Sequence, residues 1–219
     1  MTGRPVVSGD GASVRGVEPV PTDDRVRCDW GNSAPEYVTY HDEEWGTPLH
    51  GDDALFERLC LEAFQSGLSW ITILRKRPAF RAAFAGFRID AVAGFTADDE
   101  ARLMADAGTV RNRAKIAAAV RNARAAQQLP EGLSALLWSF APTVPRPRPA
   151  TLADVPATSP ESAAMAKELK RRGFVFVGPT TAYALMQATG MVDDHVATCF
   201  RATRPGAQVG SAAGIRDHG

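Results

Sequence analysis

Two pairs of potential metal ligands lie near opposite ends of this chain and constrain its fold most. Cys28 and His41 form the first pair, and His195 and Cys199 form the second. Thiolate and neutral imidazole are the usual ligands of tetrahedral zinc, and the spacing of the second pair favours one face of a helical turn. Four protein ligands leave no coordination position for water, so the pattern predicts one structural zinc per chain. The alternative for each pair is a buried cysteine beside a hydrogen-bonded histidine.

The composition predicts a compact globular protein in a reducing compartment. The 219 residues are 45% hydrophobic and 23% charged, with a formal net charge of zero. Three cysteines are too few for a disulfide framework, and the N-terminal region contains no apolar run of signal-peptide or membrane-span length. We therefore expect a cytoplasmic protein without a membrane partner. A nucleic-acid partner would have to be bound by a local basic patch.

Helical periodicity dominates the chain between two irregular ends. Residues 1–26 and 204–219 lack periodicity and are expected to be disordered tails, which leaves one folded domain at 27–203. Within it, apolar residues recur at helical spacing over 53–64, where Cys60 belongs to the buried stripe. Further helices are expected after Thr96 and over 109–128. No alternating strand pattern stands out, so the predicted fold class is all-α.

The C-terminal half contains a predicted break and a predicted hairpin between helices. Four prolines within 142–150 exclude a helix and indicate a connection, which we expect to join two helical lobes. Thr158 and Glu161 fit a capping box at the start of a helix that ends near Gly173. A hydrophobic stretch then leads to Gly178 and Thr180 at the start of another helix. Free amides at such a helix start favour a phosphate, although most turns of this kind simply join helices.

Aromatic residues cluster near the first pair of ligands. Trp30, Tyr37, Tyr40 and Trp45 surround His41 in the sequence, and they fit either a binding site or the apolar face of a short helix. Glu62 follows the buried stripe directly, and an unpaired carboxylate in that place carries a desolvation cost. It therefore needs a partner.

These segments resemble the 3-methyladenine DNA glycosylase I family. The resemblance rests on Arg27 to Trp30, Tyr37 to Gly46, Cys60 to Glu62, Gly67 to Thr72 and the hairpin through His195, and it extends over roughly residues 28–199. It implies a two-lobed helix-hairpin-helix glycosylase fold whose N- and C-terminal segments are joined by zinc. Cys28, His41, His195 and Cys199 match the zinc ligands of that family one by one.

The resemblance also implies the activity and the roles of site residues. The expected reaction is excision of 3-methyladenine from alkylated double-stranded DNA by a monomeric enzyme. Trp70 would stack on the extruded base, Glu62 would accept a hydrogen bond from its amino group, and Leu68 would fill the gap in the duplex. Trp30, Tyr37 and Tyr40 would complete the walls of the pocket. For Leu68, the plain alternative is an ordinary loop leucine.

Asp193 departs from the pattern of this family. Many helix-hairpin-helix glycosylases carry a catalytic aspartate at about this position, whereas a non-acidic residue is expected in the methyladenine branch. Asp193 is therefore either catalytic or a helix cap. Two other classes of function are a DNA-binding module without catalysis and a zinc hydrolase that uses His41 with Glu43 or Glu44. A full set of zinc ligands disfavours the hydrolase, and Glu62 and Trp70 disfavour the non-catalytic module.

Overall fold

The computed structural model describes residues 23–144 and 146–203, and most of the two expected tails lies outside this part of the chain. Every regular element in the described residues is helical, which confirms the all-α prediction. Among these helices, none has the length and apolar character needed to cross a membrane.

The helices follow one another along the chain with short connections. The N-terminal part contains η1 (Asp29–Asn32), α1 (Pro35–Thr39) and the π-helical turn η2 (Tyr40–Glu44). The middle part contains α2 (Asp52–Gln65), α3 (Trp70–Ala83), η3 (Ala85–Phe87), α4 (Ile89–Ala93), α5 (Ala97–Ala105) and α6 (Arg113–Gln127). The C-terminal part contains α7 (Leu133–Trp138), η4 (Leu152–Asp154), α8 (Pro160–Arg171), α9 (Pro179–Ala188) and η5 (Phe200–Thr203).

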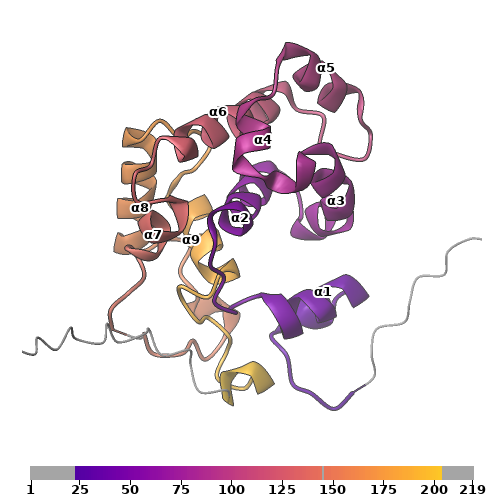
Figure 1. Ribbon diagram of the computed structural model, residues 1–219. Helices are drawn as coiled ribbons and strands as arrows, with labels where there is room; N and C mark the ends of the chain where they lie inside the picture. The colour runs from indigo at the N-terminus through magenta and orange to yellow at the C-terminus, as the bar shows by residue number, and fades with distance from the viewer. Residues whose placement is uncertain (1–22, 145, 204–219) are drawn as a thin grey trace, which may run out of the picture.

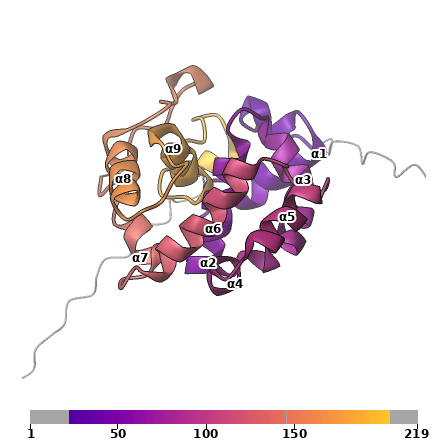
Figure 2. The same ribbon diagram turned by 90° about the horizontal axis from the view of Figure 1, so that it is seen from above.

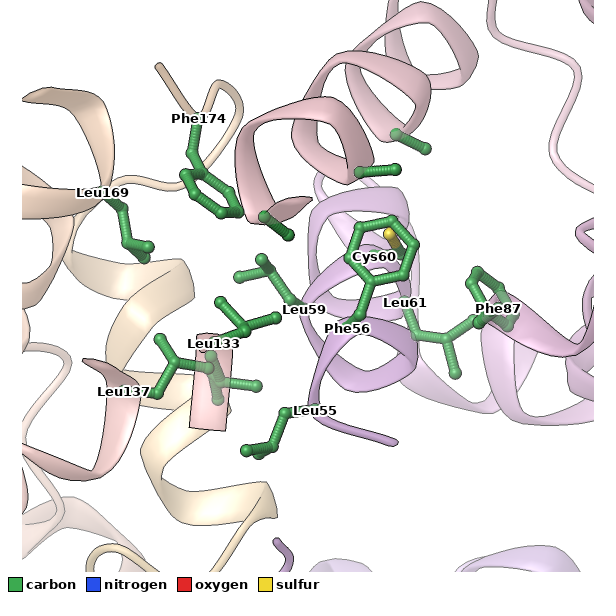
Figure 3. Close-up of a cluster of buried hydrophobic side chains, with 14 of the residues drawn as sticks. Leu55, Phe56, Leu59, Cys60, Leu61, Phe87, Leu133, Leu137, Leu169 and Phe174 are labelled. Atoms are coloured by element: carbon green, nitrogen blue, oxygen red, sulfur yellow. The ribbon is translucent and has the colours of Figure 1, made fainter. Parts of the chain in front are cut away.

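Helix α2 is the centre of the fold. Between Leu55 and Phe64 every residue except Glu57 is buried, because neighbouring helices cover α2 on nearly all sides. Figure 1 shows α3 to α5 on one side of α2 and α7 to α9 on the other, and Figure 2 shows α6 between the two groups. In Figure 3, Leu133 and Leu137 lie on one side of α2 and Phe87 lies on the other. We call the group of α7 to α9 the second lobe.

The C-terminal end of α9 is held against the segment before α2. The amide of Gly46 donates a hydrogen bond of 3.1 Å to the carbonyl oxygen of Gln187. Gly190 has a φ of +71°, and a Cβ atom there would lie 2.6 Å from the backbone nitrogen of Pro48. Only glycine allows both this conformation and this approach. The N-terminal segment is thereby fixed beside the second lobe.

The two ends of the described chain lie side by side. The amide of Phe200 donates a 2.7 Å hydrogen bond to the carbonyl oxygen of Val26, a residue within the expected N-terminal tail. The guanidinium carbon of Arg25 lies 5.1 Å from the centre of the Phe200 ring. Contacts with the C-terminal segment therefore hold the chain in place at Arg25 and Val26, before the expected start of the folded domain at residue 27.

The expected capping box of α8 is wrong by one residue. Ser159, not Thr158, caps the helix, and its partner is Ser162 instead of Glu161. A proline follows the cap and occupies the first helical position, where its fixed φ suits the helix and its missing N–H costs no hydrogen bond. The proline therefore sets the start of the helix.

The other predicted helices agree more closely with the structure. Helix α2 covers the expected 53–64, and Thr96 caps α5 through a capping box with Asp99. The helix expected over 109–128 begins only at Arg113, because the Asn112 side chain accepts a 3.1 Å hydrogen bond from the amide of Lys115 and caps α6 there. No helix forms over 142–144 or 146–150, as the prolines predict.

Candidate functional site

The structure brings the two predicted pairs of metal ligands together. One ligand atom from each of Cys28, His41, His195 and Cys199 lies within 4.8 Å of the others, and all four residues are buried. The Sγ atom of Cys199 is 3.4 Å from His41 Nε2 and 3.6 Å from His195 Nδ1, and Cys28 Sγ is 3.7 Å from His195 Nδ1. Tetrahedral zinc bonds of about 2.3 Å to sulfur and about 2.0 Å to nitrogen would separate such atoms by about 3.5 Å. The donor set therefore fits a tetrahedral ion.

The second nitrogen of each histidine also has a partner. His41 Nδ1 lies 2.8 Å from Asp42 Oδ1, and the Asp42 carboxylate accepts a 2.8 Å hydrogen bond from Arg27. His195 Nε2 lies 3.3 Å from the carbonyl oxygen of Trp45. Such partners fix the tautomer and turn the other ring nitrogen toward a metal. Burial also lowers the pKa of both histidines, which keeps the imidazoles neutral, as metal binding requires.

His195 and Cys199 do not lie on a helical turn, contrary to expectation. The amide of Cys199 bonds to the carbonyl oxygen of Val196 at 2.8 Å, which closes a tight turn. The amide of Ala197 bonds to the carbonyl oxygen of Pro149 at 2.9 Å, across to the proline-rich connection. Contacts with other segments replace the hydrogen bonds that a helix would need, and the turn still presents both side chains to the cluster.

A cavity of about 380 Å³ adjoins the metal-ligand cluster, because Trp30 and Trp45 in its wall lie against the rings of His41 and His195. It is lined by all five residues that the sequence assigned to base binding, namely Trp30, Tyr37, Tyr40, Glu62 and Trp70. They come from η1, α1, η2, α2 and α3, so the N-terminal segment supplies one wall and the two long helices supply another. The cavity is therefore assembled from segments that the fold brings together.

The aromatic walls are fixed by contacts among the rings. Trp30 lies edge-on to Tyr37 with ring centres 5.6 Å apart, and Tyr40 is tilted against Trp70 at 5.4 Å. The hydroxyl of Tyr37 accepts a 2.9 Å hydrogen bond from the amide of Ile71, which ties α1 to the start of α3. Trp70 Nε1 is buried without a hydrogen-bond partner among the described residues. A buried donor without a partner is a place where a ligand gains a contact.

Glu62 is a buried acid without an ion partner in the described chain. Its residue is only 6% exposed, and no hydrogen bond or ion pair to another described residue satisfies the carboxyl group. Arg58, one turn earlier, is instead paired with Glu44, which also accepts two hydrogen bonds of 2.7 Å from Arg77. Burial raises the pKa of Glu62 to about 8, against the opposing effect of the Arg58 charge. At neutral pH, burial therefore favours the protonated form of this acid.

Sequence reasoning missed one side of the cavity. Gln187 and Ala184 of α9 line it, as do Leu152 and Val155 at η4. These positions have no distinctive motif, and their place in the wall depends on how the second lobe packs against α2. Gln187 was detectable only as a polar residue at the end of an apolar helix.

Asp193 does not line the cavity. Its carboxylate is 37% exposed and lies 2.7 Å from Arg148 Nη2. The other carboxylate oxygen accepts a 3.3 Å hydrogen bond from the amide of His195. No helix begins at this point, so the expected role as a helix cap is wrong, and Asp193 instead braces the turn that carries two metal ligands.

Leu68 lies on an exposed turn between α2 and α3. Its residue is 41% exposed, and the preceding Gly67 has a φ of +80° that favours glycine. The buried Lys115 donates hydrogen bonds to the carbonyl oxygens of Phe64 and Ser66, at 2.9 and 2.5 Å, and so fixes the end of α2. The turn thus presents an apolar side chain from a rigid base.

The predicted hairpin connects α8 and α9. Gly178 is the N-cap of α9, and a Cβ atom added there would meet no protein atom within 4 Å. Thr180, in the first turn of α9, is exposed. Asn122 of α6 holds the hairpin through two hydrogen bonds with the backbone of Val175, of 2.8 and 3.0 Å. The start of α9 is therefore both accessible and rigidly supported.

Basic residues gather in three stretches of the sequence, at 75–77, 111–115 and 167–172, and these clusters differ in how far they are neutralised. Arg75 and Arg77 form ion pairs with Glu36 and Glu44, and Lys76 donates to a backbone carbonyl group. In the other two clusters, Arg111 precedes α6, Arg113 begins it, and Lys167 and Lys170 lie on α8. All four residues are exposed. The cluster at 75–77 is thus the least available to an external phosphate.

A comparison with protein families matches residues 30–202 to the methyladenine glycosylase family. The chain is 46% identical over 177 residues to DNA-3-methyladenine glycosylase 1 of Escherichia coli (strain K12), covering 79% of this chain and 95% of the relative. It is 44% identical over 177 residues to DNA-3-methyladenine glycosylase of Haemophilus influenzae (strain ATCC 51907 / DSM 11121 / KW20 / Rd), covering 79% and 96%.

Solved structures give the same match. A crystal structure of 3-methyladenine DNA glycosylase I has a TM-score of 0.76 and 45% identity, and the match covers 80% of this chain and 98% of that chain. A second structure, of the Staphylococcus aureus 3-methyladenine DNA glycosylase I, concerns recognition of 3-methyladenine. It has a TM-score of 0.75 and 36% identity, with 79% of this chain and 94% of that chain covered.

Proposed function

Because this chain belongs to the methyladenine glycosylase family, we infer that it hydrolyses the N-glycosidic bond of 3-methyladenine in alkylated DNA and so begins base excision repair. The observation that carries this function is the cavity, in which aromatic rings surround a buried acid that has no ion partner among the described residues. A planar base with a positive charge and an amino group suits such a site. We assign the activity to one domain, residues 27–203.

The chemistry begins with extrusion of the damaged nucleotide, because a stacked base is out of reach of a protein pocket. Trp70 stacks on the extruded base, and Trp30, Tyr37 and Tyr40 enclose it. Methylation at N3 makes the adenine cationic, and this charge lowers the pKa of Glu62 toward its usual range and favours the carboxylate. The ionised Glu62 then accepts a charge-assisted hydrogen bond from the amino group.

Bond cleavage follows from the charge of the base. The cationic base becomes neutral when it leaves, so it needs no strong general acid. The sugar develops positive charge, and the negative field of the ionised Glu62 stabilises that charge as water approaches. The enzyme thus acts mainly by holding the base where its departure is favourable.

We propose that Cys28, His41, His195 and Cys199 hold one structural zinc ion. The support is the donor set, its tetrahedral spacing and the hydrogen-bonded second nitrogens of both histidines. When bound, the metal supplies a cross-link between distant segments. The residues themselves fix the N-terminal segment that carries Trp30, Tyr37 and Tyr40 against the second lobe.

We further propose that DNA binds through a helix-hairpin-helix contact at Gly178 and Thr180, with Leu68 as a wedge. The exposed start of α9 supports the phosphate contact, and the exposed turn at Leu68 supports insertion into the duplex. We expect the enzyme to act as a cytoplasmic monomer, as the low number of cysteines favours a reducing compartment.

The experiment is release of free bases from methylated duplex DNA. Wild-type protein is expected to release 3-methyladenine. Glu62→Gln and Trp70→Ala are expected to reduce release by about tenfold or more, since each removes a contact with a charged base. Folding is monitored by circular dichroism. Absence of release by folded wild-type protein would contradict the function, and undiminished release by both variants would contradict the assigned roles.

A further inference from the structure

Gln187 adds a second polar side chain to the cavity wall. It comes from α9, whereas Glu62 comes from α2. It lies near the C-terminal end of α9 and is one of the residues that line the cavity. Its side-chain nitrogen donates a 2.8 Å hydrogen bond to Asp194 Oδ2. The same oxygen accepts a 2.6 Å hydrogen bond from the hydroxyl of Tyr183. The amide of Gln187 is therefore anchored from behind by one carboxylate oxygen.

The chemistry of Asp194 fixes which end of the amide faces away from it. A carboxylate accepts hydrogen bonds and donates none, so only the NH₂ group of Gln187 can point toward it. The amide oxygen must then point elsewhere, and no hydrogen bond to another described residue uses it. The carboxylate behind the NH₂ group also polarises the amide and increases the negative charge on its oxygen.

The carboxylate of Asp194 is buried and accepts hydrogen bonds from two side chains of the described chain. The residue is 6% exposed and forms no ion pair within the described chain. Arg146 donates a long hydrogen bond of 3.4 Å to the hydroxyl of Tyr183, but its charge is paired with Glu161. Tyr183 is itself buried. Within the described chain, the side chains that bond to this carboxylate are those of Gln187 and Tyr183.

Glu62 alone does not restrict the substrate to bases that carry an amino group. A protonated carboxyl group can donate a hydrogen bond, so Glu62 can also accommodate the keto oxygen of a methylated guanine. An amide oxygen carries no proton, so the oxygen of Gln187, whose NH₂ group bonds to Asp194, can only accept a hydrogen bond. It faces an amino group favourably and a keto oxygen unfavourably.

We propose that Gln187, oriented by Asp194, presents its amide oxygen to the base and selects amino purines over keto purines. This inference rests on the proposed function and assigns its specificity for 3-methyladenine over 3-methylguanine. Gln187 touches the base, and Asp194 is a positioning residue. Rejection follows from an unfavourable contact, since two acceptors would face each other without a proton between them.

The test is simultaneous release of 3-methyladenine and 3-methylguanine from one sample of methylated duplex DNA. Asp194→Asn allows the amide of Gln187 to turn, because asparagine can donate as well as accept. Gln187→Met removes the polar group and keeps the length. Both variants are expected to lower the ratio of the two single-turnover rate constants by about tenfold, the value of one hydrogen bond to a charged group. Tyr183→Phe removes the other hydrogen bond to Asp194 and is expected to change the ratio less than about threefold.

The ratio separates selectivity from damage to the fold, because partial unfolding lowers both rate constants together. An unchanged ratio in Gln187→Met would overturn the proposal, even if both rates fell. Equal changes of the ratio in Tyr183→Phe and Asp194→Asn would assign the effect to the network as a whole and also overturn it. If Asp194→Asn fails to fold, Gln187→Met decides alone. Release of 3-methyladenine by wild-type protein tests the proposed function separately.

Discussion

At the scale of single residues, burial of the Glu62 carboxyl group serves the proposed function but lowers the stability of the fold at neutral pH. Its pKa of about 8 in the folded protein lies well above the ordinary value of 4.5, because burial disfavours the carboxylate. The unfolded chain therefore loses this proton at lower pH than the folded chain does. The contribution of the protonated group to the free energy of unfolding is complete below pH 4.5 and is lost as the pH rises toward about 8.

We expect Glu62→Gln to remove this pH dependence. The free energy of unfolding of the wild type should fall relative to that of the variant between pH 5 and pH 8, by at most about 1.4 kcal/mol for each pH unit. Urea unfolding at a series of pH values measures the difference. Parallel pH profiles of the two proteins would show that Glu62 titrates normally in the fold.

Asp193 is expected to have only a minor catalytic role. Arg148 neutralises its charge, and its second oxygen holds the amide of His195, so the carboxylate serves the turn next to the metal ligands. Asp193→Asn keeps most of these contacts and should lower the single-turnover excision rate by less than about tenfold, which is about 1.4 kcal/mol. A hundredfold loss with normal metal content and DNA affinity would instead make Asp193 the group that stabilises the sugar cation.

At the scale of secondary-structure elements, the start of α9 offers a clean test of DNA contact. A Cβ atom at Gly178 meets no described protein atom within 4 Å, and its φ of −88° does not require glycine, so Gly178→Leu should leave the thermal midpoint nearly unchanged. It should weaken binding to DNA with an abasic-site analogue by roughly tenfold, because it blocks close approach of a phosphate. Ala101→Leu on α5 is the matched control.

Binding at two salt concentrations completes this test. We expect the affinity of the wild type to fall as salt rises, because phosphate contacts release counterions from DNA. Gly178→Leu should show a weaker dependence on salt. Equal affinity and equal salt dependence in the two proteins would remove the hairpin from the interface.

The helices were predictable where local signals agree. The apolar stripe of α2, the cap at Thr96 and the proline break all act within a few residues, and each appears in the structure. The turn from His195 to Cys199 was not predictable, because its amides bond to residues more than 40 positions away or to a neighbour within the turn. Spacing alone could not distinguish that turn from a helix.

The residues that line the cavity likewise include some that the sequence predicted and some that it did not. The residues on the N-terminal segment, α2 and α3 carry distinctive motifs, and the structure places Trp30, Glu62 and Trp70 around one cavity. The opposite wall is made by Gln187 and by the segment at η4, whose sequences indicate only a helix end and a loop. Their position depends on lobe packing, which no local pattern determines.

At the scale of the whole molecule, the metal-ligand cluster joins segments that are 167 residues apart, from Cys28 to His195. We expect one zinc ion per chain in purified protein, and we expect its removal by a chelator to lower the thermal midpoint by about 10 °C or more. Cys28→Ala should do the same. Metal analysis by mass spectrometry and thermal unfolding measure both effects.

Cys60→Ala is the matched control for Cys28→Ala. Cys60 is equally buried but lies in the core of α2, outside the cluster. Its loss should cost packing energy and leave one zinc ion per chain. Purified wild type without zinc, or a thermal midpoint that a chelator does not change, would contradict the zinc site.

The hydrogen bond between Phe200 and Val26 brings the two ends of the folded domain within reach of a short linker. The domain is therefore suited to circular permutation, with residues 203 and 23 joined and new ends opened in the proline-rich connection, where Thr143 and Val144 are exposed. In such a permutant the cluster would no longer tie the ends of the chain together. It would become a cross-link across an interior loop of a few tens of residues, and its contribution to chain entropy would shrink accordingly.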